Sequence, residues 1–195
     1  MLKLMLSDRQ QQIIDESIKL IDNKGIQGFT IKNLSKEVGI SEPGIYRHFE
    51  NKFAILTTIL DSFKNNLSEN QKRLFSNSDN PFEKLSLFST QIFEIFINNP
   101  ALITVIFSEE IYQNEKQLSY RVNEIQALNE KLITSFLIEL RQNSKLPDHV
   151  NIDSFILMFF GSIRLLAKKW KISDYSFNLK EKGDELLTSL NNSLK

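Results

Sequence analysis

Several side chains that donate hydrogen bonds lie close together in the chain, at Tyr46, Arg47, His48 and Lys52. A guanidinium group can form two parallel hydrogen bonds with the edge of a guanine, and the other three groups suit single phosphate oxygens. Any one of them alone would be an ordinary solvated residue. Within one short capped helix and the start of the next, the set predicts a surface that contacts nucleic acid.

The segment 42–49 is the helix that we expect to present these groups. At about 100° per residue, Ile45 and Phe49 share one face, and Arg47 points away from them. Gly44 is expected beside Arg47, where the missing side chain would let the backbone approach base edges closely. The outward face then carries Pro43, Gly44 and Arg47, with Tyr46 and His48 on its flanks.

Capping signals divide residues 25–53 into short helices. Thr30 and Ser41 are suited to accept hydrogen bonds from free N–H groups at the starts of helices 31–38 and 42–49. Gly39 permits the sharp reversal between them, and Asn51 can cap a third helix. This arrangement predicts a helix-turn-helix, a unit that in some proteins packs only against other proteins. The predicted DNA-contacting residues are Thr30, Ser41, Glu42, Pro43, Gly44, Tyr46, Arg47, His48 and Lys52.

The rest of the chain indicates an all-α protein of about nine helices. Apolar residues recur at helical spacing over 8–24, from 52 onward, and over 81–98, 101–107, 118–140, 152–170 and 179–194. Elements are short before residue 53 and long and phenylalanine-rich after it. We therefore predict a DNA-binding domain at 1–53 and a larger helical bundle at 54–195, which binds an effector and forms the dimer.

Composition excludes several classes of function. The formal net charge is +0, so any DNA contact depends on a few well-placed groups rather than on bulk charge. Cysteine is absent, which fits a reducing cytoplasm, and no signal peptide or membrane span is predicted. The two histidines, His48 and His149, are far apart in sequence, so we predict no metal site, no cofactor and no enzymatic activity.

The motif Val38-Gly39-Ile40-Ser41, followed by Tyr46-Arg47-His48-Phe49 and Asn51-Lys52, resembles the DNA-binding domain of the TetR family of bacterial transcriptional regulators. The resemblance covers roughly residues 7–60. It implies a homodimer on a palindromic operator, with phosphate contacts from Tyr46 and Lys52 and with base reading by helix 42–49. It also implies an effector site in the C-terminal domain.

The helix 152–170 is apolar on two faces, so one face can pack on its own domain and the other on a partner. Together with helix 179–194 it predicts a dimer seam, although a plain monomer core fits the same pattern. The predicted seam residues are Phe155, Phe159, Gly161, Leu166, Leu187 and Leu190.

Aromatic residues between 54 and 140, with a few polar ones among them, allow either an effector pocket or a simple core. The candidate pocket residues are Phe63, Phe88, Gln91, Phe107, Tyr112 and Gln126. The predicted function is a homodimeric repressor that a small, largely apolar effector releases from its operator. The alternative comes from residues 41–52 and 99–102, which also resemble nucleoid-occlusion division inhibitors of the same superfamily, whose C-terminal body docks a division protein.

Overall fold

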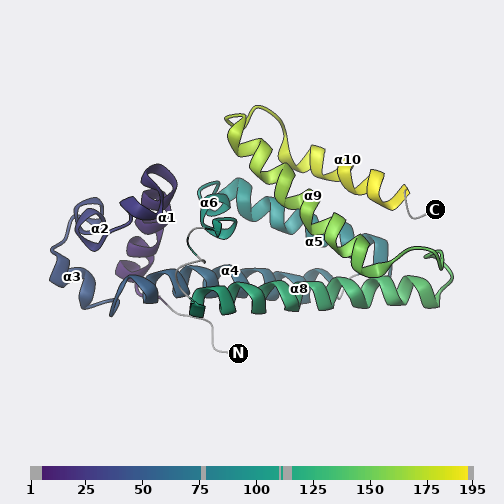
Figure 1. Cartoon of the computed structure of the whole chain (residues 1–195), viewed down its shortest axis with the longest axis horizontal. Helices are drawn as coiled ribbons and strands as arrows, with labels where there is room; N and C mark the ends of the chain where they lie inside the picture. Colours follow the sequence, from purple (N-terminus) through teal and green to yellow (C-terminus); the bar gives the residue numbers. More distant parts are fainter. Residues whose placement is uncertain (1–5, 76–77, 110, 112–115, 193–195) are drawn as a thin grey trace. The chain divides into compact units, whose positions relative to one another are not determined.

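The computed structural model describes residues 6–75, 78–109, 111 and 116–192, and it confirms the all-α prediction (Figure 1). In this described part, every regular element is a helix. The helices form two compact units, and the first comprises Met1–Asn66 and Ala101–Asn123. The second comprises Leu67–Pro100 and Glu124–Lys195. The sequence predicts one domain boundary after residue 53. In the structure, the first unit extends to Asn66 and also includes the segment Ala101–Asn123.

The first unit contains α1 (Asp8–Gly28), α2 (Ile31–Val38), α3 (Glu42–Tyr46) and α6 (Leu102–Ile106). It also contains the first part of α4 (Lys52–Phe75) and the start of α8 (Lys116–Gln142). Helix α1 packs on both α2 and α6. Its buried stripe consists of isoleucines at helical spacing: Ile13, Ile14, Ile18 and Ile21.

The ends of α1 follow from local sequence. Ser7 and Gln10 form a reciprocal capping box, in which each side chain accepts a hydrogen bond from the other residue's backbone N–H. Gly25 interrupts the helix with a positive φ of 67°. Its ψ of 179° makes this an extended conformation that only glycine adopts readily, and one more helical turn follows as far as Gly28.

The second unit contains α5 (Pro81–Asn98), α9 (Ile152–Ile172), α10 (Leu179–Asn192) and the remaining parts of α4 and α8. Helix α10 packs against both α5 and α9 (Figure 1). Phenylalanine rings fill the core, with Phe88 of α5 lying 6.0 Å from Phe159 of α9 between ring centroids. Gly183 lets α10 pack closely, because a Cβ atom there would lie 2.6 Å from Cδ2 of Phe93.

Candidate nucleic-acid interface

The predicted caps of the helix-turn-helix are confirmed. The Thr30 hydroxyl oxygen accepts a hydrogen bond from the Asn33 N–H at 3.1 Å, and that of Ser41 accepts from the Gly44 N–H at 3.2 Å. Gly39 closes α2 in the left-handed conformation, with φ 74° and ψ 32°. Each capping hydroxyl keeps its own proton, so Thr30 and Ser41 can still donate to a phosphate.

Helix α3 is short, and neighbouring residues hold it in place. The chain continues its turn beyond Tyr46, where the N–H groups of His48 and Phe49 both donate to the Ile45 carbonyl. Ile45 is fully buried and Phe49 nearly so, as the helical spacing predicts. Two α1 amides then fix the ends of the motif, since Gln10 donates to the His48 carbonyl and Gln12 to the Val38 carbonyl, each at 3.4 Å.

The outward face of α3 is open to solvent. Glu42, Pro43 and Arg47 are exposed, and Tyr46 is 52% exposed despite its ring. His48 is half-buried beside them. No hydrogen bond or ion pair involves the guanidinium of Arg47 among the described residues, so its donors are available to a ligand. Pro43 and Arg47 are therefore exposed as predicted, and their contact with DNA stays a prediction.

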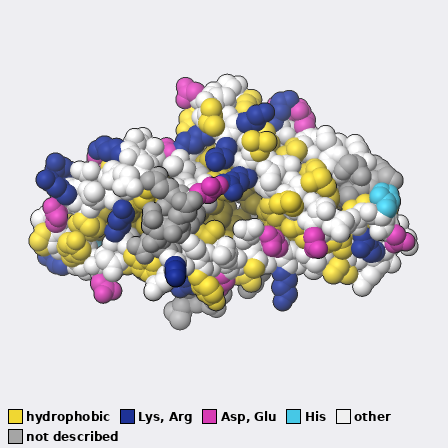
Figure 2. Space-filling view, in the orientation of Figure 1, with side chains coloured by type: hydrophobic (Ala, Val, Ile, Leu, Met, Phe, Trp, Pro, Cys, Tyr) yellow, Lys and Arg dark blue, Asp and Glu magenta, His cyan; other side chains and the backbone are white. Residues whose placement is uncertain are grey.

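Two lysines that the sequence reasoning missed lie on α2. Lys32 and Lys36 are exposed and four residues apart, so they share one side of the helix that follows Thr30. Figure 2 shows Lys and Arg side chains over the α1–α3 part of the view, at its left. The position of Lys32 and Lys36 shortly after the capping Thr30 is the sequence signal that could have identified them. It makes both lysines candidates for phosphate contacts.

The expected exposure of Gly44 on the outward face is wrong. Gly44 is buried, and a Cβ atom there would lie 3.3 Å from the Ile40 side chain. The glycine therefore allows the turn to pack closely on α3, and its contact with DNA stays a prediction. The error arose because helical angles locate a residue around α3 but do not include the chain of the preceding turn.

Lys52 is engaged inside its own unit. Its ammonium donates to the Ile26 carbonyl at 3.3 Å and lies 5.1 Å from the centroid of the Phe29 ring. The predicted cap of α4 is present, since the Ala54 N–H donates to the Asn51 side chain at 2.9 Å. An ammonium group has three donors, so a phosphate contact by Lys52 stays a prediction.

The predicted effector residues fall in both units. Phe63 is buried and Phe107 half-buried in the first, whereas Phe88 and Gln91 are buried in the second. Gln126 is exposed, and its amide donates to Glu130 at 2.8 Å, which rules out its predicted place in an interior pocket. Tyr112 lies outside the described residues.

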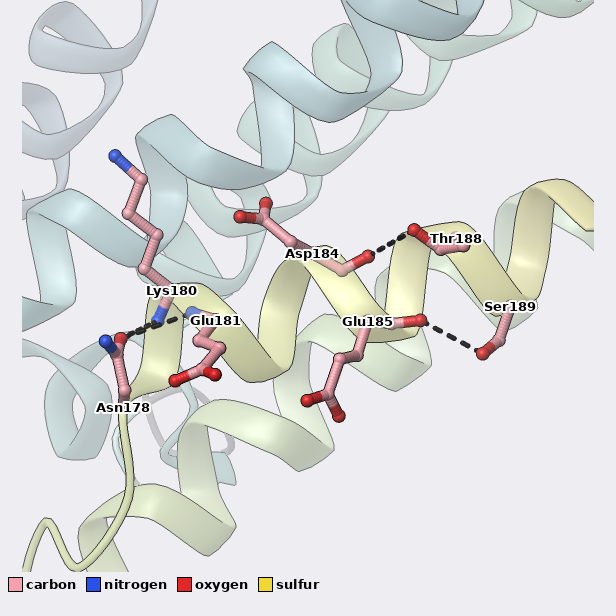
Figure 3. Close-up of a pocket in the computed structure, with 7 residues that line it drawn as sticks. All are labelled: Asn178, Lys180, Glu181, Asp184, Glu185, Thr188 and Ser189. Atoms are coloured by element: carbon pink, nitrogen blue, oxygen red, sulfur yellow. Dashed lines mark hydrogen bonds between the residues drawn. The ribbon is translucent and has the colours of Figure 1, made fainter.

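A hollow on the exposed side of α10 does not fit a largely apolar effector (Figure 3). Its lining begins at Asn178 and includes Glu181, Asp184 and Glu185, all of them exposed. Lys180 at its rim pairs with Glu94 of α5 at 3.3 Å. Because one helix supplies nearly all of this lining, the hollow has no opposing wall to enclose a ligand.

The predicted dimer residues need revision on α9. Phe155 and Phe159 are buried inside the second unit, where they stack on each other and Phe159 also packs on Phe88, so their side chains cannot meet a partner. Leu187 is buried in the same way, and Leu166 and Leu190 are half-buried. The helical pattern revealed two apolar faces but not which one the chain's own core would cover.

The exposed apolar face of α9, here termed the α9 face, consists of Leu157, Met158, Gly161 and Leu165. Leu157 is 75% exposed, Met158 50% and Leu165 58%. Nothing lies within 4 Å of a Cβ atom built on Gly161, so another helix could approach closely there. Of the predicted seam residues, Gly161 is the one on this face.

Two further observations concern the described residues alone. None of the helices described has the length and apolar character needed to cross a membrane. Across the same residues, no group of three or more His, Asp or Glu side chains is arranged to hold a metal ion.

A capped α2, a tight glycine turn and an open α3 define a helix-turn-helix DNA-binding protein. Two family descriptions match the chain: "Bacterial regulatory proteins, tetR family" over residues 13–59, and "YsiA-like protein, C-terminal region" over residues 61–192. The chain belongs to the TetR family of bacterial transcriptional regulators. The family and the structural neighbours are regulators rather than enzymes.

Individual relatives are distant but cover nearly the whole chain. The "Fatty acid metabolism regulator protein" of Bacillus subtilis (strain 168) is 23% identical over 184 residues, which is 93% of each chain. The "Nucleoid occlusion factor SlmA" of Vibrio cholerae is 22% identical over 191 residues, or 96% of each.

Solved structures share the fold. The fatty acid degradation regulator FadR from Bacillus halodurans superposes with a TM-score of 0.84 at 18% identity, covering 97% of each chain. FadR from Bacillus subtilis, solved in complex with stearoyl-CoA, gives a TM-score of 0.77 at 22% identity. It covers 95% of this chain and 99% of that one.

Proposed function

We propose that this regulator is a homodimeric repressor that binds a palindromic operator and leaves it when a long-chain acyl thioester binds to its C-terminal helices. As a protein that acts on chromosomal DNA, it works in the bacterial cytoplasm. The observation that carries the DNA-binding part is the open face of α3, from which Arg47 and Tyr46 project. A capping serine and buried apolar residues hold this helix in place.

The residues of this face divide by the contact that each can make. Arg47, at the centre, can pair in a bidentate manner with guanine, and Glu42 and Pro43 line the approach to neighbouring bases. Tyr46, Thr30 and Ser41 donate to phosphates, as do Lys32 and Lys36. His48 and Lys52 complete the set from the edges of the motif. Three lysines in each protomer make six in the dimer, so log Kobs should fall with log[salt] with a slope of about −5.

Dimerisation is needed because a single short helix reads too few bases to bind tightly. Two copies that place their α3 helices about 34–36 Å apart would reach successive turns of the major groove. The α9 face offers the surface for this pairing, since its exposed leucines and methionine have no cover in their own unit. Exposed apolar groups of this kind, gathered on one helix, are typical of association surfaces.

The acyl thioester is supported by the relatives. One is named as a fatty acid metabolism regulator, and a structure of the same fold was solved with stearoyl-CoA. The phenylalanine-rich core around Phe88 and Phe159 is chemically suited to a long alkyl chain, which would have to displace packed rings in order to enter.

Release from DNA would be a population shift. Helix α4 starts at Lys52, directly after the DNA-reading motif, and its residues from Leu67 onward belong to the second unit. A ligand that favours a different tilt of α4 therefore changes the separation of the two reading helices. A hundred-fold loss of operator affinity requires about 2.8 kcal/mol of preference for the released state.

A second candidate function is nucleoid occlusion, in which a DNA-bound protein restrains cell division. It is favoured by the match to nucleoid occlusion factors, which spans nearly the whole chain at an identity close to that of the fatty acid regulator. In that case the C-terminal unit would bind a division protein, and no small effector would be required.

Genome-wide mapping of bound DNA distinguishes the two functions. A repressor should occupy one or a few promoters, and adding a long-chain fatty acid to the culture should empty them. A division factor should occupy many dispersed sites that the fatty acid leaves unchanged, and it should co-purify with a cell-division protein. The Arg47→Ala variant is the matched control, because it should lose occupancy under either function.

A further inference from the structure

Two glutamine side chains are buried in the mainly apolar interior of the second unit, where Ser78 and Ser89 are the other buried polar residues among those described. Gln91 of α5 uses its Nε2 to donate to the Leu67 carbonyl of α4 at 2.9 Å, whereas its Oε1 atom is buried and accepts no hydrogen bond among the described residues. Gln71 lies one turn further along α4 and is only 8% exposed. Its Nε2 atom is buried, and none of the described residues accepts a hydrogen bond from it.

Gln71 occupies a position that the rest of α4 fills with apolar residues. Leu60, Phe63 and Leu67 precede it on the same buried stripe, and all three are buried. Leucine at residue 71 would continue this stripe without burying an amide. An unsatisfied buried donor destabilises a fold, and such a group therefore needs an explanation.

The surroundings of Gln71 along α4 are suited to an apolar ligand with one polar group. One turn before it, Leu67 contacts the Gln91 amide, and one turn after it, Phe75 packs edge-on against Phe136 of α8 with ring centroids 5.2 Å apart. The Gln91 Nε2 is already used by the backbone, so on α4 the Nε2 of Gln71 is a buried donor that a ligand could use. A donor requires an acceptor, such as a carbonyl oxygen.

We infer that the Gln71 side chain donates a hydrogen bond to the acyl carbonyl oxygen of the effector, and so selects an acyl thioester over a plain hydrocarbon chain. This inference rests on the proposed function, in which an acyl thioester binds to the second unit. Apolar residues around the alkyl chain supply affinity, and the Gln71 amide supplies the preference for a ligand whose carbonyl group lies beside it.

The test compares two probes, stearoyl-CoA and octadecyl-CoA, a thioether in which a methylene group replaces the carbonyl. Isothermal titration of the full chain measures both dissociation constants. The wild type should bind the thioester about three- to ten-fold more tightly, as expected for one buried hydrogen bond. In Gln71→Leu this preference should fall to about one-fold, while the thioether affinity stays within about two-fold, because only the donor has been removed.

Gln126→Leu is the matched control, since it makes the same chemical change at an exposed residue and should keep the wild-type preference. The thermal midpoint of ligand-free Gln71→Leu should equal or exceed that of the wild type. A lower midpoint with equal weakening of both probes would mean that Gln71 is structural, and would overturn the inference.

Two other results separate this inference from the proposed function. If both probes bind and Gln71→Leu keeps the wild-type preference for the thioester, the inference alone is wrong. If the wild type binds neither probe, the acyl effector and the inference fail together, whereas DNA binding by α3 stands or falls by the genome-wide map.

Discussion

The α9 face allows a quantitative prediction about dimerisation. Burying a fully exposed leucine side chain is worth about 1.5–3 kcal/mol. With 75% of Leu157 exposed, covering it in a dimer would contribute about 1.5 kcal/mol per protomer. Leu157 of both protomers would lie in a twofold interface, so Leu157→Ala should weaken the free energy of dimerisation by about 3 kcal/mol. The dimer dissociation constant should rise about a hundred-fold. Leu157→Arg, which places a charge in the seam, should leave the protein monomeric at micromolar concentration.

Sedimentation velocity over a range of concentrations measures this constant directly. Leu128→Ala is the matched control, because Leu128 is a half-exposed leucine on α8 and should leave the dimer intact. Neither Leu157→Ala nor Leu128→Ala should lower the unfolding free energy of the monomer by more than about 0.5 kcal/mol. Phe159→Ala should behave in the opposite way and lower it by about 3–5 kcal/mol, because the ring is fully buried.

The assignment of the α9 face to the dimer seam is refuted if the dimer fraction of Leu157→Arg varies with protein concentration as that of the wild type does. In that case the α9 face is a monomer surface, and the reading helices must be paired by some other part of the chain. A Phe159→Ala variant that kept wild-type stability would contradict the packing of the second unit instead.

The remaining predictions concern the DNA face and the core. Arg47→Ala should weaken operator binding by about 1–3 kcal/mol and relax the preference at one base pair in each half-site, so an unchanged footprint and base preference would exclude α3 as the reading helix. Tyr46→Phe should weaken binding by a similar factor on every sequence, as fluorescence anisotropy with specific and random duplexes can check, and loss at a single operator position would contradict a phosphate contact. Gly183→Ala should lower the unfolding free energy by about 1–3 kcal/mol, because the new methyl group would overlap the buried Phe93 ring. Urea denaturation measures this change, and a stability equal to that of the wild type would mean that α10 can shift freely.

Sequence reasoning predicted the local features of the motif because their signals are local. Thr30, Ser41 and Asn51 each cap a helix through a backbone N–H group only a few residues away. Gly39 adopts its left-handed conformation within the turn that needed it. Such contacts depend on residue type and short spacing, both of which can be read from one chain.

Features that depend on distant parts of the chain were not predictable in this way. The assignment of α6 to the first unit involves contact with α1, including a hydrogen bond between Thr104 and Asp22 at 2.5 Å. The burial of Phe159 required knowing that α5 supplies Phe88 as its neighbour. Gln71 escaped notice because an amphipathic stripe tolerates one polar residue, and only burial reveals that its donor has no described partner.

The DNA-reading surface is itself a tertiary property. Helix α3 spans only Glu42–Tyr46, far below the length at which a helix is stable alone, so its capping serine cannot hold it in place without help. Buried Ile45 and the glutamine amides of α1 supply that help, and α1 in turn packs on α6. The orientation of Arg47 therefore depends on residues more than thirty positions away in sequence, as the spacing of 38 between Gln10 and His48 illustrates. Any ligand that disturbs α1 or α4 would change how α3 meets DNA without touching α3 itself.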